Sequence, residues 1–97
     1  MLLDPEANET KALFGLFDEF GGKSVLEIGC GDGRLTWRYA ERAMRVTAID
    51  FDAGKISKAL ETRPLGMEHA QFLNVGLEPF ATQSKEKFDI AILAWSL

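Results

Sequence analysis

The sequence predicts an α/β domain built around a parallel sheet, and three observations support this prediction. Segments with apolar residues at helical spacing alternate along the chain with short apolar runs of strand type. Three glycines on alternate positions follow the first of these strand-like runs. The last apolar run, residues 90–95, is almost continuous, which is typical of a strand covered on both faces. Strands that alternate with helices require crossover connections, so the strands should be parallel.

The order of the elements follows from the residues that start and end each one. Asp4 and Pro5 suit the start of a helix, and Gly21 and Gly22 suit its end. Asp52 is placed to cap a later helix, which ends before a proline. In chain order, the patterns predict a helix over residues 4–20, a strand over 24–28, a helix over 34–44, a strand over 45–49, a helix over 53–63, a strand over 69–75, a loop, and a strand within 87–97.

Length and composition limit the classes of protein that remain. The chain has 97 residues, enough for one modest core and too few for two. No apolar run approaches the roughly 18 residues of a membrane span, and the acidic start lacks the pattern of a signal peptide. We therefore expect a cytoplasmic protein without a membrane partner. The single cysteine cannot form an intrachain disulfide, and a net charge of -4 argues against a nucleic-acid partner.

The three glycines, Gly29, Gly31 and Gly33, lie where the first strand passes into a helix. Glycine has no Cβ, so it permits positive φ and lets a ligand lie directly against the main chain. In parallel α/β sheets, ligands bind beyond the carboxyl ends of the strands, and this turn is the usual place. A tight turn without a ligand is the alternative, but one glycine would suffice for it. The three glycines, together with Asp50 at the end of the next strand, favour a binding site.

The spacing of the glycines indicates the chemical class of the ligand. A dinucleotide fingerprint of the form G-x-G-x-x-G would place its last glycine at position 34, which is occupied by Arg34. The pattern is instead E-x-G-x-G-x-G, with Glu27 two residues before the first glycine. A carboxylate at this point repels a pyrophosphate and attracts an ammonium group. A nicotinamide-dependent oxidoreductase is therefore disfavoured, and we expect a ligand that carries positive charge.

Four segments of the chain resemble the class I S-adenosylmethionine-dependent methyltransferases, in particular their small-molecule type. VLEIGCGDG, residues 25–33, is similar to the first motif of the family, and VTAID, residues 46–50, to the second. FLNVGLEPF, residues 72–80, resembles the third, although Leu-Asn stands where the family commonly has Gly-Asp. KFDIAILAWSL, residues 87–97, resembles the fourth strand. The resemblance implies a Rossmann-like three-layer sandwich, a strand order of 3-2-1-4, S-adenosyl-L-methionine as cofactor, and methyl transfer as the reaction.

The resemblance also assigns roles to matching residues. Glu27 would lie near the methionyl ammonium, and the backbone of the glycine turn would hold the methionine and ribose portions. Asp50 would accept hydrogen bonds from the ribose hydroxyls, Phe51 would line the adenine pocket, and Asn74 would meet the adenine amino group with its side-chain carbonyl. No catalytic residue and no metal ligand is identified. The cofactor-binding residues implied are Glu27, Gly29, Cys30, Gly31, Gly33, Asp50, Phe51 and Asn74.

Structural roles stay open for some residues. Phe51 suits the core as well as a cofactor pocket, Cys30 suits packing beside the ligand, and the lone His69 is interpreted as structural. One set of basic residues falls at helical spacing and would form either a solvated face, which we favour, or a phosphate-binding stripe. This set is Arg34, Arg38, Arg42 and Arg45.

The resemblance covers only the first four strands of a longer sheet. We therefore expect residues 1–97 to form a single, truncated S-adenosylmethionine-binding domain, the cofactor-binding half of an enzyme with a small-molecule methyl acceptor. On its own this chain should have little or no turnover. The fourth strand would lie at the sheet edge with an unpaired ladder, which predicts a homodimer through this strand. The alternative function is a non-catalytic Rossmann-like module that works through self-association or a partner.

Overall fold

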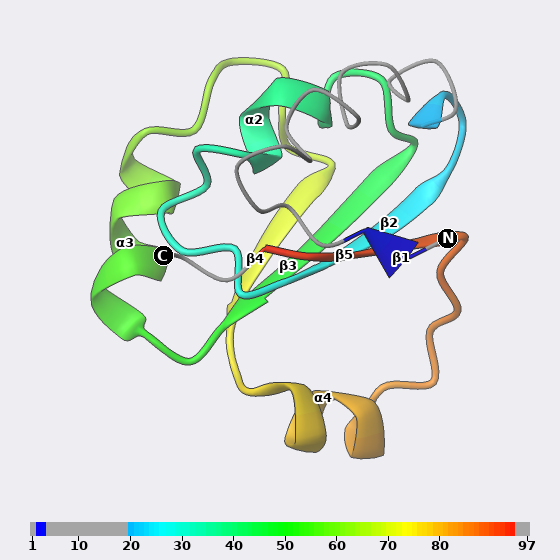
Figure 1. Ribbon diagram of the computed structural model, residues 1–97. Coiled ribbons are helices and arrows are strands. Elements are labelled where there is room, and N and C mark those ends of the chain that lie inside the picture. Colours follow the sequence, from blue (N-terminus) through cyan, green and yellow to red (C-terminus); the bar gives the residue numbers. More distant parts are fainter. Residues whose placement is uncertain (1, 4–19, 95–97) are drawn as a thin grey trace.

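The structure is a computed structural model that describes residues 2–3 and 20–94 (Figure 1). All but the last residue of the N-terminal helix expected over residues 4–20 lies outside this part of the chain. The strands are β1 (Leu2–Leu3), β2 (Ser24–Ile28), β3 (Arg45–Asp50), β4 (Ala70–Asn74) and β5 (Ile90–Leu93). The helices are α2 (Thr36–Tyr39), α3 (Ala53–Glu61) and α4 (Leu77–Gln83).

The described strands form one parallel sheet in the order β1-β5-β2-β3-β4. The four strands that the sequence predicts therefore lie in the expected 3-2-1-4 order, and the α/β fold class is confirmed. Asp89, just before β5, links β5 to β2. Its backbone N–H donates to the Ser24 carbonyl, and its carboxylate accepts from the Ser24 N–H at 2.9 Å. This reciprocal pair aligns the starts of β2 and β5. Because all the strands are parallel, their carboxyl ends share one edge of the sheet.

The position expected for the fourth strand is wrong in one respect. β5 was expected to form the edge of the sheet, but β1 pairs with it, in the register Leu2 with Ala91 and Leu3 with Ile92. The ladder of β5 is therefore paired on both sides over these two residues. The premise of an open apolar edge on the fourth strand does not hold in this fold, because the chain covers that strand with its own backbone.

Two helical segments differ from the prediction. The helix expected over residues 34–44 is reduced to α2, and the chain after it continues in turns whose backbone bonds run from Arg42 to Tyr39 and from Ala43 to Ala40. An isolated antiparallel bridge then pairs Ala43 with Gly21, shortly before β3 begins. The second difference is α4, which occupies the stretch expected to be a loop. Pro79 lies in its first turn, where a helix has no backbone N–H bond to lose.

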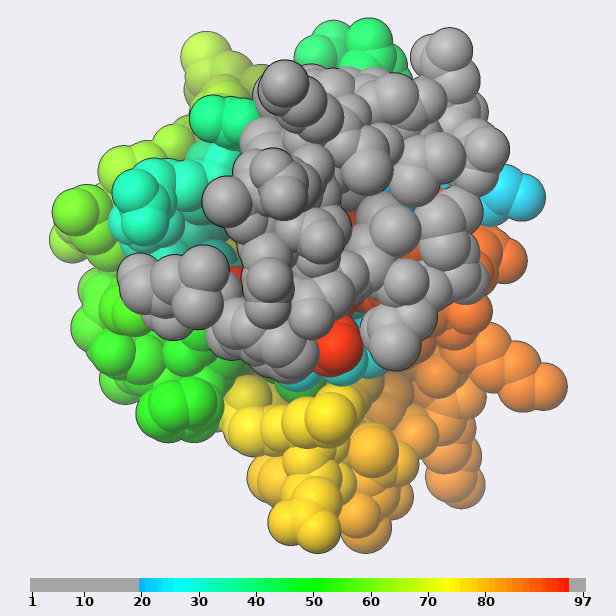
Figure 2. Space-filling model, viewed as in Figure 1, coloured from blue at the N-terminus to red at the C-terminus, as the bar shows by residue number. Residues whose placement is uncertain are grey.

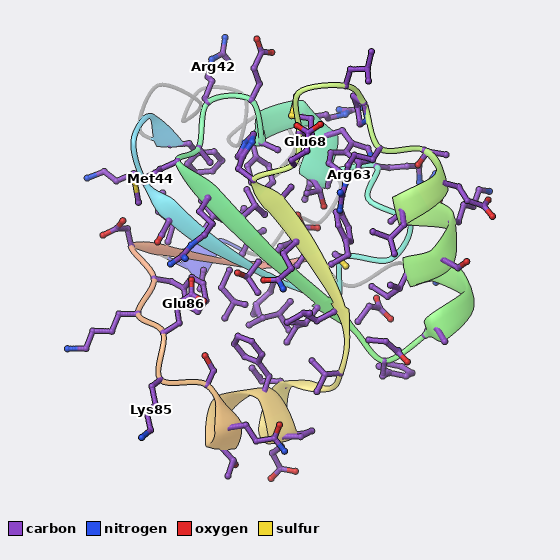
Figure 3. All side chains as sticks on the ribbon, turned by 180° about the vertical axis from the view of Figure 1, so that it is seen from behind. Arg42, Met44, Arg63, Glu68, Lys85 and Glu86 are labelled. Atoms are coloured by element: carbon purple, nitrogen blue, oxygen red, sulfur yellow. The ribbon has the colours of Figure 1, made fainter. Side chains whose placement is uncertain are left out.

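Helix α3 begins and ends close to the predicted residues. Asp52 is its N-cap, and its side chain accepts a hydrogen bond from the Lys55 backbone N–H at 3.2 Å. After the helix, Arg63 reaches across to β4 and donates to the Ala70 carbonyl at 3.1 Å (Figure 3). His69, at the start of the same strand, contacts the Ala40 carbonyl, which agrees with the structural interpretation of this histidine.

The core lies between one face of the sheet and the helices α2 and α3. Tyr39 from α2 and Ile56 and Ala59 from α3 pack with the inward side chains of the strands. On the opposite face, Thr47 and Ile49 of β3 are buried. Other apolar side chains of that face are partly buried, namely Leu26, Ile28, Leu73, Ala91 and Leu93. Within residues 2–3 and 20–94, no helix has the length and apolar character that crossing a membrane requires.

Helix α4 lies at the carboxyl end of the sheet and buries none of its residues. Figure 2 shows α4 and the segment after it, in yellow and orange, at one end of the molecule. The four arginines noted in the sequence are exposed, and Arg45 forms an ion pair with Glu86 while Arg34 forms one with Asp32. Of the four, only Arg38 lies in α2, so they form no continuous helical stripe. Their exposure agrees with the solvated face, which stays a prediction.

Candidate functional site

The glycine turn is fixed to the carboxyl end of β3. The backbone N–H groups of Gly29 and Cys30 both donate to the Ile49 carbonyl, at 2.9 and 3.1 Å. Gly29 has φ of 78° and Gly31 has φ of 58°, so both adopt the left-handed conformation that favours glycine. The turn therefore lies beside the end of β3, as the sequence predicts for a ligand site at this edge of the sheet.

Asp50 connects this turn to the loop after β3. Its Oδ2 accepts from the Gly31 N–H and its Oδ1 accepts from the Asp52 N–H, both at 2.8 Å. Asp50 is buried, with 8% of the residue exposed. Each carboxylate oxygen has a second lone pair, which leaves capacity for two hydroxyl donors. Asp50 is therefore both an anchor of the turn and a candidate acceptor for a vicinal diol.

Glu27 is fully buried near the end of β2, and its two carboxylate oxygens differ in their hydrogen-bond partners. Oε1 accepts hydrogen bonds from the Tyr39 hydroxyl at 2.6 Å and from the Thr36 hydroxyl at 2.7 Å. Oε2 has no hydrogen-bond partner among the residues that the structure describes. An unpartnered buried carboxylate oxygen is costly, so a protein retains one where a ligand or a proton compensates for it.

Burial raises the pKa of Glu27 from 4.5 to about 7, while the hydrogen bonds from Tyr39 and Thr36 act in the opposite direction. The nearby charge of Asp50 raises it further. Burial also raises the pKa of the Tyr39 hydroxyl well above its usual range, and the charge of Glu27 adds to this effect. Tyr39 thus stays protonated and remains a hydrogen-bond donor to Glu27 at ordinary pH.

The last two glycines of the turn serve different purposes. Among the described residues, a Cβ added at Gly31 would meet only the Lys55 side chain, at 3.8 Å, which leaves space for a ligand to approach the backbone. A Cβ at Gly33 would lie 2.9 Å from Nε1 of Trp37 and 3.2 Å from Cζ of Phe72. Packing of these two aromatic rings therefore accounts for the glycine at position 33, and its cofactor role stays a prediction.

Cys30 is buried and unreactive in this setting. Its Sγ contacts the Gly31 carbonyl at 3.7 Å, and burial together with the charges of Glu27 and Asp50 raises the pKa of its thiol far above the usual range. The thiolate is the reactive form of cysteine, so a thiol held protonated has little nucleophilic character. The structure agrees with the interpretation of Cys30 as a small packing residue in the turn.

The two residues expected near adenine lie at the rim of the site. Phe51 is 86% exposed directly after Asp50, so the alternative of a core role is wrong. Asn74 lies opposite Asp50 in the β3–β4 register, and its Nδ2 donates to the Asp50 carbonyl at 3.1 Å. With the amino group of its amide engaged there, the Oδ1 atom of Asn74 remains an acceptor, as the predicted contact to an amino group requires.

Sequence reasoning missed the hydroxyl groups that hold Glu27. Thr36 and Tyr39 lie three positions apart at the two ends of α2, a spacing at which side chains share one face of a helix. An inward-facing glutamate in an apolar strand requires polar partners, and this requirement could have identified the hydroxyl residues on the facing helix. Sequence reasoning also missed Lys55, whose side chain lies near Gly31.

These features fit the ligand class implied by the charge of Glu27. The unpartnered, buried Oε2 of Glu27 suits a cation, the absence of a Cβ at Gly31 suits close approach to the backbone, and Asp50 suits hydroxyl donors. The register of β2 against β3 pairs Ile28 with Ile49, so both carboxylates lie near the same end of adjacent strands. The convergence that the sequence predicts for these two acids is therefore present.

Known proteins match most of the chain. Residues 25–97 match the methyltransferase domain family. A ubiquinone biosynthesis O-methyltransferase from Stutzerimonas stutzeri is 36% identical over 70 residues, which are 71% of this chain and 30% of that protein. The chain thus spans about a third of the length of the curated relatives it matches, with shares of 30% and 35% for two of them.

Solved structures match the fold over nearly the whole chain. A precorrin 8W decarboxylase from Methanobacterium thermoautotrophicum has a TM-score of 0.69 and 31% identity, covering 92% of this chain and 49% of that one. A phosphoethanolamine N-methyltransferase from Haemonchus contortus, in complex with phosphoethanolamine and S-adenosylhomocysteine, has a TM-score of 0.71 and 25% identity, covering 93% and 19%. The chain therefore belongs to the class I S-adenosylmethionine-dependent methyltransferase family, as its motifs imply.

Proposed function

We propose that this chain binds S-adenosylmethionine at the carboxyl ends of β2 and β3 and supplies the cofactor-binding part of an enzyme that methylates a small molecule. The observation that carries the proposal is the fully buried Glu27, whose Oε2 lacks a partner beside a glycine turn. An ammonium group provides the charge and the N–H donors that this oxygen lacks. No pyrophosphate-binding fingerprint competes for the same turn.

Different residues of the chain would bind different parts of the cofactor. Glu27 takes the methionyl ammonium, the backbone at Gly29, Cys30 and Gly31 supports the methionine and ribose portions, and Asp50 accepts from the ribose hydroxyls. When bound, the cofactor supplies an activated methyl group on a sulfonium sulfur. The protein's task is then to align the acceptor with that methyl group and to exclude water, because orientation supplies much of the rate gain in such a displacement.

Two features at the rim would bind the adenine base. Phe51 presents an exposed ring directly after Asp50, and Asn74 presents an acceptor oxygen on the neighbouring strand. A small-molecule acceptor is supported by the relatives, since one is named for ubiquinone biosynthesis and a structural neighbour is in complex with phosphoethanolamine. The methyltransferase activity of the whole protein and the identity of its acceptor belong to this proposal.

Calorimetric titration tests the proposed binding. We expect heat of binding with S-adenosylmethionine and S-adenosylhomocysteine and none with NAD. Asp50→Ala should abolish the heat, whereas Asp52→Ala, which removes a helix cap near the site, should retain it. Because Asp50 also holds two backbone N–H groups, circular dichroism must confirm that the variant is folded before its loss of binding counts. No heat with any adenosyl compound would instead favour the non-catalytic module.

Phe51→Ala gives a test that leaves the core untouched. We expect the affinity for S-adenosylhomocysteine to fall about tenfold, because stacking of a base on an aromatic ring contributes ~1–3 kcal/mol. The melting temperature should not change, since the ring is 86% exposed. Leu65→Ala, at a residue 97% exposed and remote in sequence from the motifs, is the matched control and should change neither quantity. Equal affinity in parent and Phe51→Ala would remove Phe51 from the site.

The homodimer expected through the fourth strand remains a proposal with an added condition. β5 already pairs with β1 on one side and β2 on the other. A second copy could pair with β5 only if β1 left its place. Sedimentation of the chain at increasing concentration tests for such a dimer.

A further inference from the structure

We propose that Thr36 and Tyr39 are positioning residues that hold Oε1 of Glu27, and that an ammonium ligand displaces a proton from Oε2 of Glu27 into solvent when it binds. This inference rests on the proposed function, since it takes the ammonium from an adenosyl amino acid. It goes beyond that function because it describes cofactor binding as the exchange of a proton for an ammonium group at Oε2 of Glu27.

The geometry around Glu27 determines which oxygen carries the proton. Both hydroxyl donors point at Oε1, at 2.6 Å from Tyr39 and 2.7 Å from Thr36. An oxygen that already accepts two hydrogen bonds is a poor site for a further proton. In the ligand-free protein the proton of the carboxylic acid therefore resides on Oε2, which accepts no hydrogen bond from residues 20–94. The ammonium group then takes the place that the proton leaves.

The groups around Glu27 make this exchange thermodynamically reasonable. Asp50 at the end of β3 is the acid that acts on it, Cys30 in the glycine turn is a neutral thiol, and Tyr39 on α2 is a neutral donor. Neither of the two ion pairs that the structure shows in residues 20–94 involves Glu27. With a pKa of about 7, Glu27 is about half protonated at neutral pH.

Proton release on binding provides the direct measurement. Titration calorimetry with S-adenosylhomocysteine in buffers of different ionisation enthalpy counts the protons exchanged. We expect release of about half a proton at pH 7 and close to one at pH 6, because the bound carboxylate is ionised. The affinity should rise about tenfold between pH 6 and pH 8 for the same reason. Methylthioadenosine, which lacks the amino-acid end, is the matched ligand and should bind without proton release.

Three variants test the positioning roles. Tyr39→Phe keeps the ring that packs against Phe20 at 5.0 Å and removes only the hydroxyl. Thr36→Val likewise keeps the shape of the side chain. Each removes a hydrogen bond that lowers the pKa of Glu27, so the midpoint of its carboxyl titration, followed by carbon-13 NMR in the ligand-free protein, should move upward. Thr36→Ser restores the hydroxyl and should return the midpoint toward that of the parent.

The possible outcomes separate this inference from the proposed function. Binding of S-adenosylhomocysteine with no proton release and the same affinity at pH 6 and pH 8 would overturn the exchange and leave the proposed function intact. No binding at all would overturn both. If Tyr39→Phe and Thr36→Val weaken binding equally at every pH and leave the Glu27 midpoint unchanged, the two residues are merely structural and their positioning role is wrong.

Discussion

Glu27→Gln is expected to bind S-adenosylhomocysteine about a hundredfold more weakly than the parent. Its free energy of unfolding, relative to that of the parent, is expected to increase as the pH rises. The loss of affinity follows from removing the charge partner of a desolvated ammonium, which typically costs ~2–5 kcal/mol. Equilibrium titration at pH 8, where the parent carboxylate is ionised, measures this loss. A variant that binds as tightly as the parent would contradict the assignment of Glu27 to the ammonium.

The gain in relative stability follows from the raised pKa of Glu27. Its pKa is about 7 in the folded protein and 4.5 in the reference state, so between these values the folded chain holds the proton that the unfolded chain has lost. The free energy of unfolding contributed by Glu27 is thus complete below pH 4.5 and is lost as the pH rises to 7. Glutamine does not titrate, so the free energy of unfolding of Glu27→Gln lacks this pH dependence.

Urea unfolding at pH 5 and pH 8 measures this difference. The free energy of unfolding of Glu27→Gln, relative to that of the parent, should increase by about 2–3 kcal/mol between the two pH values. Glu41→Gln, at an exposed glutamate, makes the same change of net charge and should show little pH dependence of this kind. An equal trend in both variants would assign the effect to net charge and not to burial.

Gly33→Ala is expected to lower the free energy of unfolding by about 3 kcal/mol. The residue has φ of 85°, and a left-handed conformation costs an alanine ~1–2 kcal/mol. Its new Cβ would also lie 2.9 Å from Nε1 of Trp37 and 3.2 Å from Cζ of Phe72, so the two rings would have to move apart. Overpacking of this kind typically costs a further ~1–3 kcal/mol.

Gly66→Ala separates the two contributions. Gly66 has nearly the same φ, 84°, but a Cβ there would meet no atom of residues 20–94 within 4 Å. It should therefore lose only the cost of the backbone conformation, and denaturant unfolding of both variants gives the steric part by difference. Equal losses at positions 33 and 66 would show that Trp37 and Phe72 yield without cost, and that packing does not explain the glycine in the third position of the motif.

The sequence predicts the strands well because their signals are local. Ser24–Ile28 matches its predicted bounds, and Arg45–Asp50 differs from its prediction by one residue, since apolar β-type residues occupy the buried positions. The helix after the glycine turn is shorter than predicted, and the segment after it forms turns and a bridge between Ala43 and Gly21. The spacing of apolar residues in the sequence gives no information about that tertiary contact.

The site shows the same division between local and tertiary information. The motif identifies Glu27 and Asp50, and their positions on adjacent strands follow from a parallel sheet. The partners of each carboxylate could not be deduced in this way, because the hydroxyls of Thr36 and Tyr39 reach Glu27 only once α2 packs on the sheet. The same holds for the contact between Asp50 and the Gly31 N–H, which depends on the conformation of the turn.

The pairing of β1 with β5 bears on how the chain acquires its structure during synthesis. Leu2 and Leu3 leave the ribosome well before their partners Ala91 and Ile92, which lie 89 positions further along the chain. This pairing cannot form until β5 has emerged, and closing so long a loop carries an entropic cost that local pairings avoid. The β2–β3–β4 portion can assemble earlier, so β1 and β5 should pair after that portion has formed.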